Sequence, residues 1–176
     1  MQRFKWLPVL CALGLCVVAA LALAAEKPLA AKATLKAAGE KPFGTVTFTQ
    51  QADGVRVVVD VAGAEPGKHG LHIHQNGECT PPFKTAGDHF NPDHADHSCP
   101  PTASRHSGDF GNLEVGADGT AHWEGVVDKI SLTDPAHLVI GKSVILHAKE
   151  DDCKTQPTGA SGDRIACGVV EAAPQK

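Results

Sequence analysis

The stretch Gly44-Thr-Val-Thr-Phe-Thr-Gln50 decides the fold, because its apolar and polar side chains alternate and its β-branched residues favour extended backbone. Residues 55–61, Val-Arg-Val-Val-Val-Asp-Val, follow the same pattern. Between the two lies Ala52-Asp53-Gly54, which has the residues of a tight turn. The two segments are therefore expected to form an antiparallel β-hairpin.

Further strands are expected along the rest of the chain. A second hairpin is predicted over residues 112–127, with its turn at 117–119, and single strands are predicted at 143–148 and 165–170. The Ala- and Lys-rich residues before Gly44 are interpreted as a lead-in. No segment after the N-terminal region has the 3.6-residue period of an amphipathic helix. The pattern predicts an all-β protein, an antiparallel sandwich or barrel.

Two long irregular stretches interrupt the strands, from residue 75 to 109 and from 149 to 164. Both are rich in proline, glycine, histidine and charged residues. Loops of this length in a compact domain are usually either functional or disordered. Their histidines and cysteines favour a functional role.

The N-terminus has the layout of a secretory signal peptide. Arg3 and Lys5 precede an apolar run over residues 7–23, and small residues follow before the first acid, Glu26. We expect residues 1–24 to be cleaved and residues 25–176 to form one domain, since this length suits a single core. The alternative is a retained N-terminal membrane anchor, because the apolar run approaches the length of a membrane span.

Charge and cysteine content narrow the class further. Without Arg3 and Lys5, 14 basic residues face 20 acidic ones, so the exported chain is acidic and no basic stripe favours nucleic acid. Removing the signal peptide leaves an even number of cysteines, which fits an oxidising compartment and two disulfides. Those cysteines are Cys79, Cys99, Cys153 and Cys167. Their spacing is not that of a thiolate zinc site.

Histidine spacing suggests a metal centre. His72 and His74 lie at positions i and i+2, so on a strand both rings point to one side. Alone, this pair could equally be an exposed polar strand face. Further histidines strengthen the metal interpretation, because four imidazoles suit copper, while three imidazoles and one carboxylate suit zinc. The further candidates are His89, His97, His106, Asp109 and His147.

Four motifs carry a family resemblance: Gly-Leu-His-Ile-His at 70–74, Ala-Gly-Asp-His-Phe-Asn-Pro at 86–92, His-Ser-Gly-Asp-Phe-Gly-Asn at 106–112 and Gly-Asp-Arg-Ile-Ala-Cys-Gly-Val at 162–169. They resemble the signatures of the copper,zinc superoxide dismutases, and the similarity runs from about Lys32 to Val170. The resemblance implies a Greek-key, immunoglobulin-like β-sandwich or flattened barrel with two long functional loops.

The resemblance also implies the ligands. Copper would be bound by His72, His74, His89 and His147, and zinc by His89, His97, His106 and Asp109. His89 would be shared as a bridging imidazolate, which two adjacent cations favour. Asp151 corresponds to a carboxylate that orients one copper ligand and one zinc ligand, here His72 and His97. The remaining histidines, His69, His94, His122 and His137, are not assigned to metal.

Two disulfides and one arginine beside the copper position are also expected. The resemblance implies a disulfide between Cys79 and Cys167, and it places Arg164 beside the open copper position, where its fixed fork of donors suits a small anion. A second disulfide, Cys99 to Cys153, is expected because each cysteine lies two residues beyond one end of the implied Asp151–His97 contact, a reach of about 7 Å. The alternative is two free thiols.

The activity implied by the resemblance is dismutation of superoxide to dioxygen and hydrogen peroxide. Copper would cycle between Cu(II) and Cu(I), His89 would take up and release a proton, and Lys154 would help to attract the anion. The signal peptide and the even cysteine count predict export to the periplasm or the extracellular space. The expected partners are superoxide and an unidentified copper donor, and a homodimer is compatible with the family. The rivals are a copper-carrying module without turnover and a two-zinc hydrolase.

Overall fold

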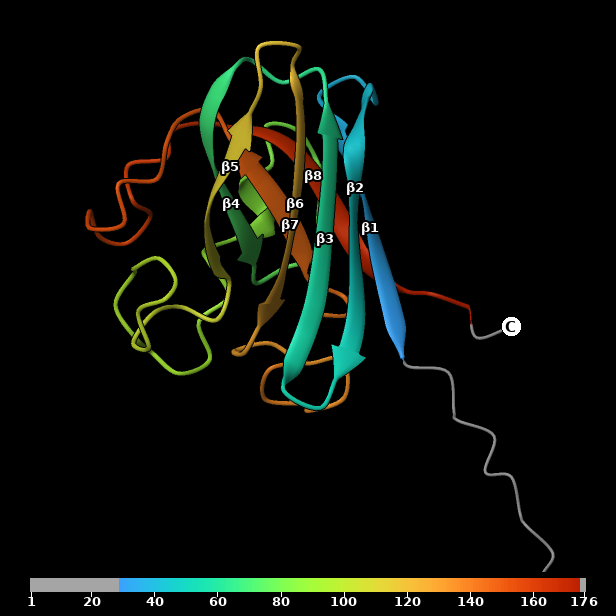
Figure 1. The fold of residues 1–176 in the computed structure, drawn as a ribbon, viewed down its shortest axis with the longest axis vertical. Coiled ribbons are helices and arrows are strands. Elements are labelled where there is room, and N and C mark those ends of the chain that lie inside the picture. The colour runs from blue at the N-terminus through green and yellow to red at the C-terminus, as the bar shows by residue number, and fades with distance from the viewer. Residues whose placement is uncertain (1–28, 175–176) are drawn as a thin grey trace, which may run out of the picture.

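The computed structural model describes residues 29–174, so the expected signal peptide at 1–24 lies outside the described residues. Eight antiparallel strands surround one core (Figure 1). They are β1 (Ala30–Ala37), β2 (Pro42–Gln51), β3 (Gly54–Ala62), β4 (Gly67–His74), β5 (Asp109–Val115), β6 (Thr120–Val127), β7 (Ser143–His147) and β8 (Arg164–Ala172). The prediction of an all-β sandwich or barrel is confirmed.

The first expected hairpin is present. β2 and β3 pair from Gly44 opposite Val61 to Gln51 opposite Gly54, with the predicted turn between them. Alternate residues of both strands are buried, including Val46, Phe48 and Val57. Burying one side chain in two against the core is what the alternation in the sequence predicts.

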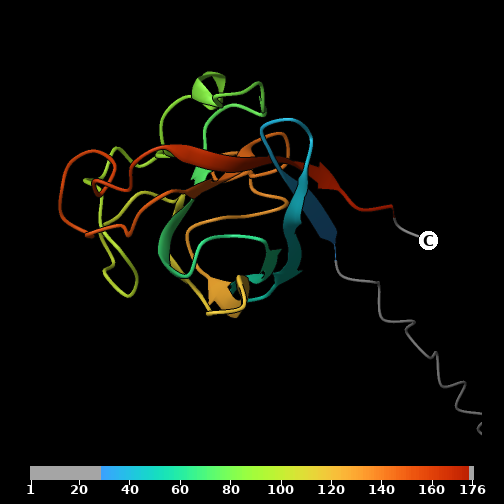
Figure 2. The same ribbon diagram turned by 90° about the horizontal axis from the view of Figure 1, so that it is seen from above.

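The second expected hairpin is wrong in its pairing. Residues 116–119 do form a tight turn, in which the amide of Gly119 donates to the carbonyl of Gly116. The two strands that leave this turn nevertheless pair with other partners, β5 with β4 and β6 with β3. β5 and β6 are the two ends of the strand order β5-β4-β7-β8-β1-β2-β3-β6. The sheet curls so that these ends approach each other (Figure 2).

The Ala- and Lys-rich lead-in is a full strand. β1 lies between β2 and β8, and its alternate residues Ala31, Ala33 and Leu35 enter the core. Alanine and lysine have low β propensity, which hides this strand from a reading based on residue type. Its alternation of small apolar and charged residues is the signal that identifies it.

The two predicted loops lie together at one side of the barrel (Figure 1). One runs from β4 to β5 and contains a single short 3₁₀ helix at Lys84–Ala86, and the other joins β7 to β8. A third irregular stretch, residues 128–142, joins β6 to β7 and was not predicted. Among residues 29–174, no helix has the length and apolar character needed to cross a membrane.

Candidate metal centre

β4 presents two histidines to the loops. His72 and His74 point to the same side of the strand, and both are fully buried because the loops cover that side. Leu71 and Ile73 point the opposite way, into the core. The strand therefore places two rings next to each other beneath the loops.

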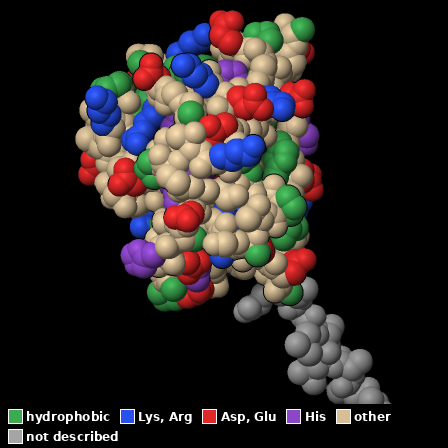
Figure 3. All heavy atoms as spheres, turned by 90° about the vertical axis from the view of Figure 1, so that its left-hand side faces the viewer, with side chains coloured by type: hydrophobic (Ala, Val, Ile, Leu, Met, Phe, Trp, Pro, Cys, Tyr) green, Lys and Arg blue, Asp and Glu red, His purple; other side chains and the backbone are tan. Residues whose placement is uncertain are grey.

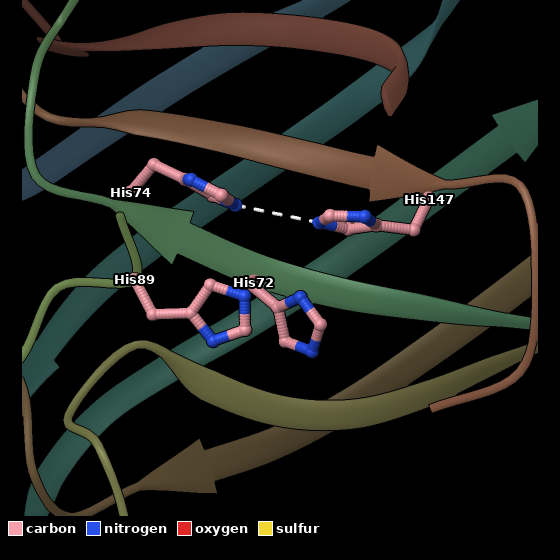
Figure 4. A group of neighbouring side chains, drawn as sticks. All are labelled: His72, His74, His89 and His147. Carbon is pink, nitrogen blue, oxygen red and sulfur yellow. Dashed lines mark hydrogen bonds between the residues drawn. The ribbon is translucent and has the colours of Figure 1, made fainter. Parts of the chain in front are cut away.

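His89 and His147 complete this group (Figure 4). His147 is the last residue of β7, just beyond a shift in the register of the β7–β8 pairing. The main chain of His89 forms an isolated β-bridge with His74, which fixes this part of the β4–β5 loop against β4. One ring nitrogen of each of the four histidines lies within 4.8 Å of those of the other three.

Hydrogen bonds select the tautomer of three of these rings. Each donates one N–H outward: His72 Nε2 to Asp151 Oδ2 at 2.8 Å, His74 Nδ1 to the Gly87 carbonyl at 2.8 Å and His147 Nδ1 to the Gly162 carbonyl at 3.2 Å. A neutral imidazole that donates from one nitrogen has a lone pair on the other. Three lone pairs therefore face the interior of the group.

Two observations show that these residues fit a metal ion. His72 Nδ1 and His89 Nε2 are buried without a hydrogen-bond partner. The Nε2 atoms of His74 and His147 lie 3.3 Å apart (dashed line in Figure 4) although each ring already donates through Nδ1, so neither neutral ring has a proton for this contact. Unpaired buried nitrogens are costly, and a cation among them would satisfy all four.

The charge state of this group also suits a metal. Burial lowers the pKa of all four rings, to about 4 for His89 and about 3 for His147, and to well below the usual range for His74. The imidazoles are therefore neutral near pH 7. Neutral imidazole is the form that binds transition metals.

A second group adjoins the first and shares His89. Its members are His89, His97, His106 and Asp109, all buried, with their donor atoms within 4.8 Å of one another. Asp109 Oδ1 lies 2.8 Å from His89 Nδ1, and its Oδ2 lies 3.0 Å from His97 Nδ1. His97 Nδ1 is nevertheless without an aligned hydrogen bond. Its nitrogen and the carboxylate oxygen are thus arranged as two ligands of one cation, and this set of donors fits zinc.

Electrostatics of the second group differ from those of the first. Burial would raise the pKa of Asp109, but the rings of His106, His89 and His97, each with Nδ1 within 3.3 Å of the carboxylate, outweigh it and hold that pKa far below the usual range. Burial would likewise lower the pKa of His97, yet the carboxylate of Asp109 beside Nδ1 and the hydrogen bond from Nε2 to Asp151 raise it to about 9. Without a metal, the carboxylates hold a proton on His97. A bound cation would take the place of that proton.

Asp151 connects the two groups. Its Oδ2 accepts from His72 Nε2 at 2.8 Å, and its Oδ1 accepts from His97 Nε2 at 2.9 Å. The carboxylate is fully buried, and the hydrogen bonds from His72 and His97 lower its pKa despite that burial. Asp151 thus orients one ring of each group, in the arrangement that the family resemblance implies.

Two amide side chains that were not predicted from the sequence hold these residues. Asn112 bonds the main chain of Asp151 through Oδ1 at 2.7 Å and Nδ2 at 2.8 Å. Gln156 bonds the main chain of His97 in the same way, at 2.7 and 2.9 Å. Asn112 lies within a quoted motif, but nothing in the sequence around Gln156 points to His97.

Arg164 lies beside the first group, at the start of β8. Its guanidinium donates to the carbonyls of Phe83 and Gly87, at 2.6 and 2.7 Å. Burial lowers the pKa of Arg164, but a guanidinium stays charged at neutral pH. A cavity of about 300 Å³ opens over His89. It is lined by Gln75, Asp88, His89, Asn91, His94, His106, Pro157 and Thr158. Lys154 is exposed on the same loop and is not among these lining residues.

Both expected disulfides are present. Cys79 is joined to Cys167, with Cα atoms 5.5 Å apart, and Cys99 to Cys153, with Cα atoms 5.1 Å apart. The first links the β4–β5 loop to β8. The second links that loop to the β7–β8 loop next to the His97–Asp151 contact. Because their sulfurs are bonded to each other, Cys99 and Cys153 are not available as thiolate ligands beside Asp151.

The other histidines lie outside both groups. His69 is buried, with Nδ1 2.8 Å from the carbonyl of His147 and Nε2 2.9 Å from that of Glu65. His122 and His137 pair with nearby aspartates at the surface, and His94 is exposed at the edge of the cavity. Figure 3 shows the loop-covered face, where positive and negative side chains are mixed.

Known proteins resemble this chain in sequence and in fold. A family model described as copper/zinc superoxide dismutase matches residues 43–170. A double mutant of a SOD-like protein from Bacillus subtilis, with a tyrosine and a proline replaced by histidine, has 33% identity and a TM-score of 0.74, covering 80% of this chain and 96% of its own. The clock protein EA4 has 36% identity and a TM-score of 0.76, covering 84% and 96%.

Proposed function

The chain belongs to the copper/zinc superoxide dismutase family, and from this membership we propose that it converts two superoxide anions and two protons into dioxygen and hydrogen peroxide. The observation that carries the proposal is the pair of buried donor groups sharing His89. One ring that belongs to both groups allows two cations to lie close together, which is what a bridging ligand requires. Family membership by itself supports a function of the superoxide dismutase type.

We assign a different metal to each group. The four-imidazole group, His72, His74, His89 and His147, would hold copper, and the group of His89, His97, His106 and Asp109 would hold zinc. Imidazole nitrogens without an oxygen donor suit copper, whereas three imidazoles and a carboxylate suit tetrahedral zinc. Bound copper, alternating between Cu(II) and Cu(I), would supply the one-electron oxidation of one superoxide and the reduction of the next.

His89 would hold and pass on a proton. Its Nε2 faces the four-imidazole group and has no hydrogen-bond partner, while its Nδ1 faces Asp109 at 2.8 Å. The ring also lines the cavity, while Nε2 itself is buried against the other three imidazoles. These contacts support a role in delivering one of the two protons that peroxide formation needs.

Arg164 would bind and orient the superoxide anion. Its two carbonyl contacts fix the plane of the guanidinium, which leaves the remaining N–H groups in a set direction. The charge of this half-buried group is screened less than that of a surface lysine. Asp151 would keep His72 and His97 in the tautomers that the two metals need.

A copper-carrying protein without turnover is the second candidate. The similar structures include a SOD-like protein and a clock protein, so the fold alone does not specify the activity. This chain has every residue of both donor groups, together with Arg164. That complete set favours turnover over storage.

Metal analysis combined with an activity assay tests the proposal. The protein loaded with copper and zinc is expected to dismutate superoxide, and His147→Ala is expected to lose most copper and most activity. His122→Ala is the matched control, since this exposed ring pairs with Asp60 and lies outside both donor groups. Full activity in His147→Ala would contradict the copper assignment. Loaded but inactive wild-type protein would favour the carrier.

The cellular setting is part of the proposal. Two disulfides indicate an oxidising environment, which supports export to the periplasm or the extracellular space with residues 1–24 removed as a signal peptide. The partners would be superoxide as substrate and a copper donor, and a homodimer is compatible with the family. The net acidic charge of the chain gives no reason to propose a nucleic acid as a partner.

A further inference from the structure

The side chain of Gln156 bonds both main-chain groups of one buried histidine. Its Oε1 accepts from the amide of His97 at 2.7 Å, and its Nε2 donates to the carbonyl of the same residue at 2.9 Å. Nε2 also lies 3.3 Å from the carbonyl of Lys154, within the same loop. The amide of Gln156 therefore makes the two main-chain hydrogen bonds that a neighbouring strand would otherwise make with His97.

His97 needs this support because no strand holds it. It belongs to the irregular loop between β4 and β5, and its side chain is buried. Both ring nitrogens are already directed, Nδ1 toward Asp109 and Nε2 toward Asp151. A ring directed at two fixed carboxylates keeps its position only if its own main chain is fixed as well.

Asn112 does the same for the other end of this contact. Its amide bonds both main-chain groups of Asp151, at 2.7 and 2.8 Å. The His97–Asp151 hydrogen bond thus has a side-chain amide holding the main chain at each end, and the Cys99–Cys153 disulfide lies beside it. The repetition of one bonding pattern at both ends argues against an incidental surface contact.

We infer that Gln156 is a positioning residue for zinc: it holds the main chain of His97 so that Nδ1 faces Asp109 and His106 before the cation arrives. This inference rests on the zinc assignment proposed above and deepens it. Gln156 belongs to neither donor group and does not line the cavity over His89. Its effect passes through His97. Replacing Gln156 should therefore change the affinity and ligand geometry of the zinc group more than those of the copper group.

Two substitutions separate the parts of this bond. Gln156→Ala removes both contacts and should weaken zinc binding by about 10-fold to 100-fold, the usual range for residues that orient a metal ligand. Gln156→Glu keeps an acceptor for the amide of His97, but an ionised carboxylate cannot donate to the carbonyl. Its zinc affinity should lie between those of Gln156→Ala and the wild type.

The test uses the disulfide-bonded mature protein without copper. Zinc affinity and the rate of zinc release are measured by competition with a chromogenic chelator. The visible spectrum of bound Co²⁺ reports the geometry of the same ligands. The matched control is Gln51→Ala, which replaces an exposed glutamine at the end of β2. Its zinc affinity and Co²⁺ spectrum should equal those of the wild type. Circular dichroism checks that each variant is folded.

Each outcome decides the question. Weaker zinc binding and an altered Co²⁺ spectrum in Gln156→Ala, with partial recovery in Gln156→Glu, support the inference. Zinc affinity within twofold of the wild type and an unchanged Co²⁺ spectrum would overturn it. If Gln156→Ala does not fold, Gln156→Glu decides by the same two measurements. The zinc assignment itself fails only if Asp109→Asn also binds zinc as the wild type does, so the two failures are distinguishable.

Discussion

Arg164 donates a hydrogen bond of 2.7 Å to the carbonyl oxygen of Gly87. The same oxygen accepts from His74 Nδ1 at 2.8 Å. One peptide group thus positions both the guanidinium proposed to bind superoxide and a ring proposed to bind copper. The Cys79–Cys167 disulfide ties the loop that contains Gly87 to β8, which begins with Arg164.

Replacing Arg164 should slow the reaction without removing the metals. Arg164→Ala deletes the charge and the oriented donors, so we expect kcat/KM to fall by roughly 10-fold to 100-fold. Arg164→Lys should fall less, because it keeps the charge but lacks the planar fork. Superoxide decay followed at matched copper and zinc content measures both. An Arg164→Ala enzyme as fast as the wild type would remove this residue from the substrate site.

Asp88 should slow the approach of superoxide. It follows Gly87, lines the cavity with His89 and lies near enough to raise the pKa of Arg164, against the larger effect of burial. Asp88→Asn removes one negative charge at the cavity, which should raise kcat/KM by roughly twofold at low ionic strength. The gain should shrink near 0.15 M salt, where the Debye length is about 8 Å. Rates measured over a salt series test this.

The control for the Asp88 variant is Asp53→Asn, which removes the same charge from the exposed turn between β2 and β3. Net charge changes equally in the two variants. Equal acceleration in both would mean that overall charge governs the rate, not the position of Asp88.

The second disulfide should stabilise the metal-free protein. Cys99 and Cys153 are 54 residues apart, and the chain-entropy model gives about 4 kcal/mol for closing a loop of this length. The double variant Cys99→Ser, Cys153→Ser should therefore have a lower free energy of unfolding, by up to about that amount. Urea unfolding with the Cys79–Cys167 bond intact measures the difference. An unchanged urea midpoint would show that the bond does not constrain the unfolded chain.

Local pattern explains which strands could be predicted. The β2–β3 hairpin follows from alternation within one short segment and a turn inside it. β5 and β6 are also joined by a turn, but their partners β4 and β3 come from elsewhere in the chain. A turn sequence fixes the direction change and not the hydrogen-bond partner. Curling of the whole sheet decides that partner, and local pattern does not encode it.

The same distinction holds for the site. The seven candidate ligands lie at spacings that a family resemblance can identify. The amides of Asn112 and Gln156 contact residues 39 and 59 positions away, and asparagine or glutamine in a loop has no distinctive pattern. His69 is similar, since only the fold shows that its ring reaches the carbonyl of His147. Supporting residues become visible only when the loops are folded together.

Gly159 provides the sharpest test of how closely the loops are packed. Its φ of +64° favours glycine, and a Cβ built there would overlap Asp151 Oδ1 and lie 2.6 Å from His97 Nε2. Gly159→Ala should therefore break the Asp151–His97 hydrogen bond. We expect a loss of roughly 2–4 kcal/mol in stability, from backbone strain and overpacking together, and weaker zinc binding.

Gly141→Ala separates the two causes. Gly141 has a similar φ, +82°, but a Cβ there would meet no atom within 4 Å. This variant should lose only the roughly 1–2 kcal/mol of a left-handed alanine and should bind zinc normally. Thermal unfolding and zinc competition on both variants give the comparison. If Gly159→Ala matched Gly141→Ala in both measurements, the contact between Asp151 and His97 would be adaptable, and neither the carboxylate nor the amides around it could be said to fix the metal ligands.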